Sequence, residues 1–212
     1  MVKPVSTAMV GGSFNPVHLG HLHLVHTVVT STRYRQFIFV PVAQNNFKRD
    51  ASLVEAHHRL NMLNLSFAAY GRLYPEDPPI TLVSDPCEIE RGGVSYTYDT
   101  VKDLYLKYSI RGRLGLVMGD DLLSDLPKWH AYEEMKELVS FVVIRRDKEA
   151  KPFHDYAVDL EYIDNARVED SSTAIREACA SLGRDEPLPQ DIRSLMSEEV
   201  ADYVQQNRLY RP

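Results

Sequence analysis

Residues 11–22 read Gly11-Gly12-Ser13-Phe14-Asn15-Pro16-Val17-His18-Leu19-Gly20-His21-Leu22 and follow a short apolar run at residues 7–10. The apolar run is typical of a buried strand, and residues 19–31 are typical of a helix. Two glycines let a ligand approach the backbone closely, and the first turn of a helix offers free N–H groups to an anion. Because ligands bind at the carboxyl ends of strands in open parallel sheets, this stretch predicts a phosphate site.

The rest of the chain alternates short apolar runs with helical patterns. Further strands are expected at residues 37–40, 80–83, 114–118, 139–144 and 158–163, and further helices at residues 55–70, 97–108, 132–138, 172–181 and 197–207. This alternation predicts an α/β fold, a Rossmann-like, doubly wound parallel sheet with helices on both faces. The breaker-rich stretches at 71–79 and 183–189 do not separate regions of different character. We therefore expect one domain over residues 1–212, with a helical C-terminal portion from about residue 171.

Two histidines stand at the start of the first expected helix. His18 and His21 lie three residues apart, so both side chains project to the same side and can donate to phosphate oxygens. A metal site is the competing hypothesis, because His23 and His26 follow closely. On a helix these four rings spread around the axis, and neither a cysteine nor a carboxylate lies among them. We therefore expect phosphate binding and no metal held by the protein.

A second candidate anion site lies near the other end, in Asp170-Ser171-Ser172-Thr173-Ala174-Ile175-Arg176-Glu177. Ser172 is expected to cap the helix that follows. The free N–H groups of that helix, the Ser172 and Thr173 hydroxyls and the Arg176 guanidinium then form an anion cradle. An ordinary capped helix with an incidental arginine is the alternative, which this motif alone leaves open. The glycine patterns of ordinary dinucleotide-binding proteins, GxGxxG, and of P-loop proteins, GxxxxGK[ST], are both absent from the sequence.

Composition limits the function classes. The chain has 212 residues, of which 44% are hydrophobic and 25% charged, and this ordinary globular composition excludes a disordered protein. The net charge is −6, and the first 60 residues hold six basic side chains against two acidic ones. The acidic excess in the remainder argues against a nucleic-acid-binding protein. With no apolar run long enough for a membrane, no expected secretory signal and two cysteines outside any metal or redox spacing, we expect a cytoplasmic protein.

The stretch at residues 11–22 closely resembles the nucleotide-binding signature of the HxGH nucleotidyltransferase superfamily, and its GSFNP spelling is similar to that of the bacterial nicotinate-nucleotide adenylyltransferases. Residues 171–176, SSTAIR, resemble the SSTxIR motif with which that family grips the triphosphate of ATP. Residues 95–100 (SYTYDT) and 118–121 (MGDD), followed by the only tryptophan, resemble the elements that enclose the pyridine ring and its ribose. The resemblance therefore covers most of the chain.

The resemblance implies roles for individual residues. Catalytic roles fall to His18, His21, Lys48 and Arg176. Contacts with ATP and its phosphates fall to Gly11, Gly12, Ser13, Phe14, Gly20, Arg145, Ser172 and Thr173, and contacts with the acceptor nucleotide to Asn15, Thr97, Gly119, Asp121 and Trp129.

Two positions qualify this picture. Lys48 lies in Asn45-Asn46-Phe47-Lys48-Arg49, where the family usually has PPHK, so the two prolines and the histidine are missing. Arg59 either matches a family position or is a surface arginine of an amphipathic helix, and both interpretations stay open.

The activity that the resemblance implies is attack of the 5′-phosphate of nicotinate mononucleotide on the α-phosphorus of ATP, which gives nicotinate adenine dinucleotide and pyrophosphate in a step of NAD biosynthesis. The attacking phosphate is already ionised near pH 7, so no general base is needed, and catalysis rests on aligning the two anions and stabilising charge. Mg²⁺ is expected to arrive with ATP, because no carboxylate cluster stands out in the sequence. ATP and a pyridine mononucleotide are the expected partners, with neither nucleic acid nor membrane, and association into a homo-oligomer is left open. The alternatives are nicotinamide mononucleotide or pantetheine phosphate as the acceptor, or a non-catalytic nucleotide- or metal-binding protein.

Overall fold

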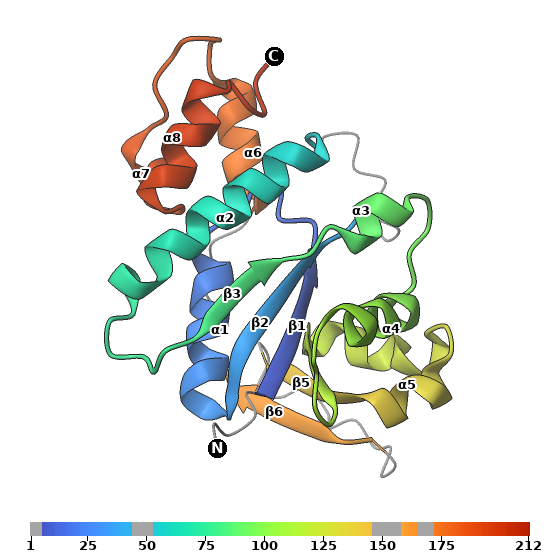
Figure 1. The fold of residues 1–212 in the computed structure, drawn as a ribbon. Coiled ribbons are helices and arrows are strands. Elements are labelled where there is room, and N and C mark those ends of the chain that lie inside the picture. The colour runs from blue at the N-terminus through green and yellow to red at the C-terminus, as the bar shows by residue number, and fades with distance from the viewer. Residues whose placement is uncertain (1–5, 44–52, 146–157, 165–171) are drawn as a thin grey trace.

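The computed structural model describes residues 6–43, 53–145, 158–164 and 172–212. Its centre is a parallel sheet of six strands in the order β3-β2-β1-β4-β5-β6 (Figure 1). The strands are β1 (Ser6–Gly12), β2 (Tyr34–Pro41), β3 (Thr81–Ser84), β4 (Leu114–Gly119), β5 (Val139–Arg145) and β6 (Leu160–Asp164). The strand order reverses between β1 and β4, which is where open α/β sheets bind ligands.

Helices cover both faces of the sheet. Successive side chains of a strand point to opposite faces, so each buried strand contributes apolar side chains to two cores. On β2, Phe37 and Phe39 belong to one hydrophobic core, whereas Ile38 and Val40 belong to the other. The first core is covered by α1 (Leu19–Ser31), α2 (Ala56–Leu73), α6 (Ser172–Ser181) and α8 (Glu198–Gln206), and the second by α4 (Thr97–Lys107), the 3₁₀ helix η1 (Asp120–Lys128) and α5 (Tyr132–Leu138). The doubly wound parallel sheet expected from the sequence is therefore confirmed.

The C-terminal helices α6, α7 (Gln190–Arg193) and α8 gather beside α2 (Figure 1). The hydroxyl of Tyr203 on α8 accepts a hydrogen bond from Asn61 Nδ2 (3.0 Å) and bonds to His58 Nδ1 (2.9 Å), both on α2. Ile175 of α6 and Val200 of α8 lie in the same core as the buried side chains of α1. Because these helices share that core, we keep one domain over residues 1–212 as a proposal.

The sequence prediction differs from the structure mainly in short elements. The bounds expected for α1, α5 and α6 match, β1 and β2 extend further at both ends, and β6 begins at residue 160 rather than at 158. The prediction misses α3 (Cys87–Arg91), α7 and η1. Elements of four or five residues carry too few apolar positions to show a period, and Pro127 inside η1 argues against a helix there. Within the described ranges, no helix has both the length and the apolar character that a membrane crossing requires.

Candidate active site

The glycine turn after β1 and the end of β4 lie at one edge of the sheet. Gly11 and Gly12 are the last residues of β1. Val10 of β1 pairs with Val117 of β4, so Gly119, at the end of β4, lies at the same carboxyl edge. The expected glycine turn therefore stands where the strand order reverses.

Phe14 shapes the turn between β1 and α1. Its φ is +48°, in the left-handed region that costs a non-glycine residue roughly 1 kcal/mol. Its ring is buried and lies 5.2 Å from the ring of His21 and 5.4 Å from that of Phe39, measured between centroids. A Cβ on Gly12 would stand 3.1 Å from this ring, so the close approach favours glycine there. The free energy gained by burying the ring offsets the cost of the strained backbone. Because the side chain is buried, only the main chain of Phe14 can contact a ligand.

The two signature histidines lie together at the start of α1. His18 is the N-cap residue, and its backbone N–H donates to Nδ1 of His21 (3.1 Å). Since Nδ1 accepts this bond, the neutral ring of His21 carries its proton on Nε2, which is then a hydrogen-bond donor. The two ring centroids are 3.9 Å apart, so the expected placement of both rings on one side is confirmed. Their contact with phosphate stays a prediction.

The second motif docks directly on the first. Arg176 Nη1 donates to the carbonyl of Asn15 (2.8 Å), although the two residues are 161 positions apart in the chain. Ser172 Oγ donates to the carbonyl of Pro16 (2.8 Å), and Arg176 Nη2 donates to the Thr173 hydroxyl (3.1 Å). Ser172 lies within α6 rather than at the expected cap position, and its hydroxyl points to the segment that precedes α1. The fold thus brings the two candidate anion sites side by side.

Asn15, which is expected to contact the acceptor nucleotide, is buried in the structure. Its residue surface is 1% exposed, and its Oδ1 accepts the backbone N–H of Val54 (3.3 Å), just before α2. The side chain therefore ties the turn to α2, and its contact with an acceptor nucleotide stays a prediction. Of the other signature positions, Gly11 is exposed, whereas Ser13 and Gly20 are half-buried.

Arg59 is not a surface residue, so that interpretation of it is wrong. The residue is 1% exposed, and its guanidinium donates to three backbone carbonyls, those of Ser13 (3.0 Å), Val42 (2.8 Å) and Val54 (3.3 Å). Burial lowers the pKa of this guanidinium below its ordinary value. Lys48 and the atypical residues 45–47 lie outside the described residues, so the role expected of Lys48 stays a prediction.

The end of β4 carries two of the expected acceptor contacts. A Cβ on Gly119 would overlap the Oδ1 atom of Asp121, because that carboxylate folds back over the glycine. Trp129 follows η1, is half-buried and packs against the second core, so part of its ring serves packing, and its contact with the acceptor nucleotide stays a prediction. The neighbouring His130 ring lies 4.5 Å from that of Tyr96, so the residues after η1 adjoin the segment before α4.

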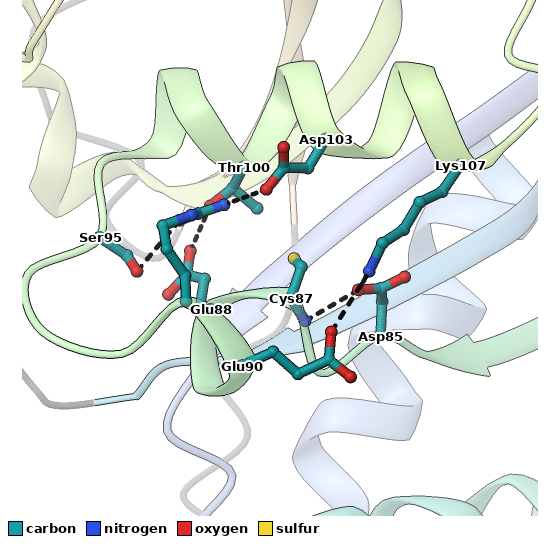
Figure 2. A network of polar contacts seen from close by, with 9 residues as sticks. Asp85, Cys87, Glu88, Glu90, Ser95, Thr100, Asp103 and Lys107 are labelled. Carbon is teal, nitrogen blue, oxygen red and sulfur yellow. Dashed lines mark hydrogen bonds and ion pairs between the residues drawn. The ribbon is translucent and has the colours of Figure 1, made fainter.

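A polar network holds the segment that leads to Thr97, the first residue of α4. Arg91 donates to the hydroxyls of Ser95 (3.1 Å) and Thr100 (3.3 Å) and forms an ion pair with Asp103 (2.5 Å). Figure 2 shows that these partners come from the loop and from α4, with Glu88 beside them. The Thr100 hydroxyl donates to Glu88 (2.7 Å), whose pKa is raised by burial. This network, which the sequence reasoning misses because its members are scattered polar residues, fixes the start of α4.

Beside it, a second cluster links the end of β3 to the end of α4 (Figure 2). The Asp85 carboxylate accepts from Lys107 Nζ (3.1 Å), the Tyr108 hydroxyl (3.0 Å) and the backbone N–H of Cys87 (2.9 Å). Burial alone would raise the pKa of Asp85, but these donors outweigh it and the pKa is lowered. Burial, with Asp85 nearby, raises the pKa of the Cys87 thiol to about 12. The cysteine is therefore a thiol at neutral pH, not a nucleophile.

Arg145 lies at the end of β5, at the carboxyl edge of the sheet. Its guanidinium stacks over the Tyr162 ring (5.3 Å to the centroid) and pairs with Asp164 (3.8 Å), both on β6. These contacts place Arg145 two strands away from β1, and its contact with ATP stays a prediction.

The histidines that follow the signature serve other contacts. His26 Nδ1 bonds to both carboxylate oxygens of Asp77 (2.9 and 3.0 Å), and its ring stacks on Tyr74 with 4.3 Å between centroids. Among the described residues, no group of three or more His, Cys, Asp or Glu side chains is arranged to hold a metal. The hypothesis of a histidine metal site finds no support in these contacts.

Comparison with known proteins identifies the family of this chain. The profile of the cytidylyltransferase-like family matches residues 9–178. A probable nicotinate-nucleotide adenylyltransferase of Dehalococcoides mccartyi is 32% identical over 97% of both chains. One of Treponema pallidum is 38% identical over 64% of this chain, and the match spans 63% of that relative's length. The solved structure of the Plasmodium falciparum nicotinic acid mononucleotide adenylyltransferase, complexed with NaAD, shares the fold. It is 20% identical, with a TM-score of 0.68 and a match over 98% of both chains.

The profile match spans most of the sheet and both signature motifs, from β1 into α6. The Dehalococcoides relative matches along nearly the whole chain. The chain therefore belongs to the cytidylyltransferase-like family, and within it to the nicotinate-nucleotide adenylyltransferases.

Proposed function

We propose that this protein transfers the adenylyl group of ATP to nicotinate mononucleotide, giving nicotinate adenine dinucleotide and pyrophosphate. The observation that carries the proposal is the docking of α6 on the turn after β1, through the Arg176–Asn15 and Ser172–Pro16 hydrogen bonds. This contact sets the arginine and the two signature histidines around one turn at the reversal of the strand order. Several donors around one site suit a substrate with several phosphates.

In this reaction an oxygen of the acceptor 5′-phosphate forms a bond to the α-phosphorus of ATP. The bond from that phosphorus to the bridging oxygen of the β-phosphate breaks, and pyrophosphate leaves with the electron pair. Nε2–H of His21 donates to the α-phosphate oxygens, where negative charge develops, while Arg176 and Lys48 offset the charge of the leaving group. The protein itself supplies alignment and charge stabilisation, without a general base or a covalent intermediate.

Mg²⁺ fits this scheme as a companion of ATP. The described residues offer no cluster of carboxylates and histidines arranged to enclose a cation, so the triphosphate oxygens are its expected ligands. The ion neutralises part of the triphosphate charge. Removal of Mg²⁺ with EDTA should therefore stop turnover, and added Mg²⁺ should restore it.

The test is release of pyrophosphate with ATP and each of three acceptors: nicotinate mononucleotide, nicotinamide mononucleotide and pantetheine phosphate. We expect the highest kcat/KM with nicotinate mononucleotide. A higher kcat/KM with either of the other two acceptors would identify that molecule as the substrate instead. No pyrophosphate release with any of the three would overturn the proposal. The cytoplasmic location and self-association expected from the sequence also stay proposals.

A further inference from the structure

Arg59 is a buried cation in the first turn of α2. It is 1% exposed, and in the described part of the chain its hydrogen bonds go to three backbone carbonyls. Burying a charge is costly unless hydrogen bonds compensate it. A buried arginine whose N–H groups donate to main-chain oxygens therefore stabilises a particular arrangement of the backbone.

The three carbonyls come from three separate segments. Ser13 belongs to the turn after β1, Val42 follows β2, and Val54 precedes α2. We call Arg59 with these three carbonyls the Arg59 clamp. Val42 and Val54 stand on either side of the stretch of sequence that contains Lys48. Two further bonds join the same segments, from Val42 N–H to the Gly12 carbonyl (3.0 Å) and from Val54 N–H to Asn15 Oδ1 (3.3 Å).

The bond to Ser13 acts on the strained part of the turn. The carbonyl of Ser13 and the N–H of Phe14 belong to one planar peptide group, so fixing the carbonyl fixes the direction of that N–H. Phe14 stands at φ +48°, a conformation that persists only where surrounding contacts impose it. A cation on the carbonyl oxygen also polarises the peptide and strengthens its N–H as a donor.

We propose that Arg59 is a positioning residue for nucleotide binding, which aligns the turn after β1 and both flanks of the segment carrying Lys48 without touching the substrate. This inference rests on the proposed function. Lysine keeps the charge but has no rigid fork of donors, so it cannot reproduce bonds to three separated carbonyls. Methionine keeps much of the volume and removes all the donors.

The chain offers a matched control in Arg35. Its guanidinium also donates to three backbone carbonyls, those of Val29 (3.1 Å), Thr32 (2.9 Å) and Tyr34 (2.7 Å). These lie at the amino-terminal edge of the sheet, where α1 ends and β2 begins. Loss of Arg35 therefore reports the structural cost of losing such an arginine without a change at the nucleotide turn.

The experiment compares Arg59→Lys and Arg59→Met with Arg35→Lys and Arg35→Met at a temperature at which circular dichroism shows all four to be folded. Readouts are kcat, KM for each substrate, and the Kd of a non-hydrolysable ATP analogue. We expect the Arg59 variants to lose at least about tenfold in kcat/KM and to bind the analogue more weakly, whereas the Arg35 variants stay within about twofold of wild type. If Arg59→Met does not fold, Arg59→Lys decides.

Two further readouts separate a positioning role from general destabilisation. Hydrogen exchange at the Phe14 amide should accelerate in the Arg59 variants and not in the Arg35 variants. Equal losses of kcat/KM and of analogue affinity in both sets, or no loss in either, would overturn the inference. If wild type releases no pyrophosphate with any acceptor, the proposed function fails, while the analogue Kd still tests Arg59.

Discussion

At the scale of single residues, a backbone hydrogen bond orients the ring of His21. Its Nδ1 accepts the His18 N–H, so the hydrogen-bond donor of its neutral ring is Nε2–H. We predict that His21→Ala lowers kcat by about 10³-fold, the effect of removing a donor that acts on charge developing in the transition state. Steady-state pyrophosphate release measures this loss.

The control for His21 is His26→Ala on the same helix. His26 bonds to Asp77 and stacks on Tyr74, so its loss should lower the melting temperature and leave kcat near the wild-type value. Turnover by His21→Ala close to that of His26→Ala would contradict the role given to His21.

Gly119 allows a second test at this scale. An alanine Cβ there would overlap the Asp121 carboxylate, which would have to leave its position at the end of β4. We predict that Gly119→Ala raises KM for the mononucleotide by about tenfold and changes KM for ATP less. Gly71→Ala, on α2 with nothing within 4 Å of the added atom, should leave both KM values unchanged. Equal KM values in wild type and Gly119→Ala would remove Gly119 from the acceptor site.

Sequence reasoning found those single residues that stand in compact motifs. The glycines, the histidine pair and Arg176 are such residues. The glycine turn was expected at the carboxyl end of a strand, but no rule of sheet geometry predicted that α6 would dock on it. The burial of Arg59 and Asn15 could not be predicted. Asn15 bonds to a backbone group 39 positions away and Arg59 to groups up to 46 positions away, and no local pattern shows that a polar side chain is buried. The same limit hid the left-handed Phe14, which tertiary packing imposes.

At the scale of elements, long periodic helices and apolar strands were predicted from their own residues, whereas the short α3 and η1 were not. Their structure depends on contacts with neighbours: α3 is held through Glu88 to Thr100 of α4, and Leu123 and Leu126 of η1 lie in the second core. Elements whose structure depends on contacts with their neighbours are thus the ones least visible in the sequence.

The Asp85 cluster, which links the end of β3 to the end of α4, gives a prediction for the pH dependence of stability. The folded-state pKa of Asp85 is lowered by Lys107, Cys87 and Tyr108 despite burial, so the carboxylate stabilises the fold fully above the unfolded value of about 3.9. This contribution is lost as pH falls through 3.9 towards the folded pKa. Asp85→Asn should lower the free energy of unfolding at pH 7 by about 1–3 kcal/mol.

Urea unfolding between pH 7 and pH 3 measures this effect. The wild-type protein should lose stability more steeply with falling pH than Asp85→Asn does. Glu90→Gln is the control, since Glu90 lies 3.8 Å from the same lysine and is mostly exposed. Parallel curves for wild type and Asp85→Asn would show that Asp85 does not set the acid dependence.

At the scale of the whole molecule, the site is built from both ends of the chain, because Arg176 and Ser172 of α6 bond to the turn after β1. A nucleotide that contacts both segments binds the folded state and not the unfolded chain. At a concentration 100 times its Kd, such a ligand stabilises the fold by about 2.7 kcal/mol. For a protein of this size that corresponds to a rise in melting temperature of roughly 5–10 °C.

We therefore predict that Mg²⁺ and a non-hydrolysable ATP analogue raise the melting temperature of wild type by this amount and that of Arg176→Ala by much less. Removing Arg176 takes away both the bond to the Asn15 carbonyl and a cation beside the expected triphosphate. Arg208→Ala is the matched control, because Arg208 also lies in the C-terminal helical portion but pairs with Asp185 at the surface. It should keep the full shift. If the ligand raised the melting temperature of Arg176→Ala as much as that of wild type, the nucleotide would bind through the turn after β1 alone. The contact between α6 and that turn would then stabilise the fold without contributing to nucleotide binding.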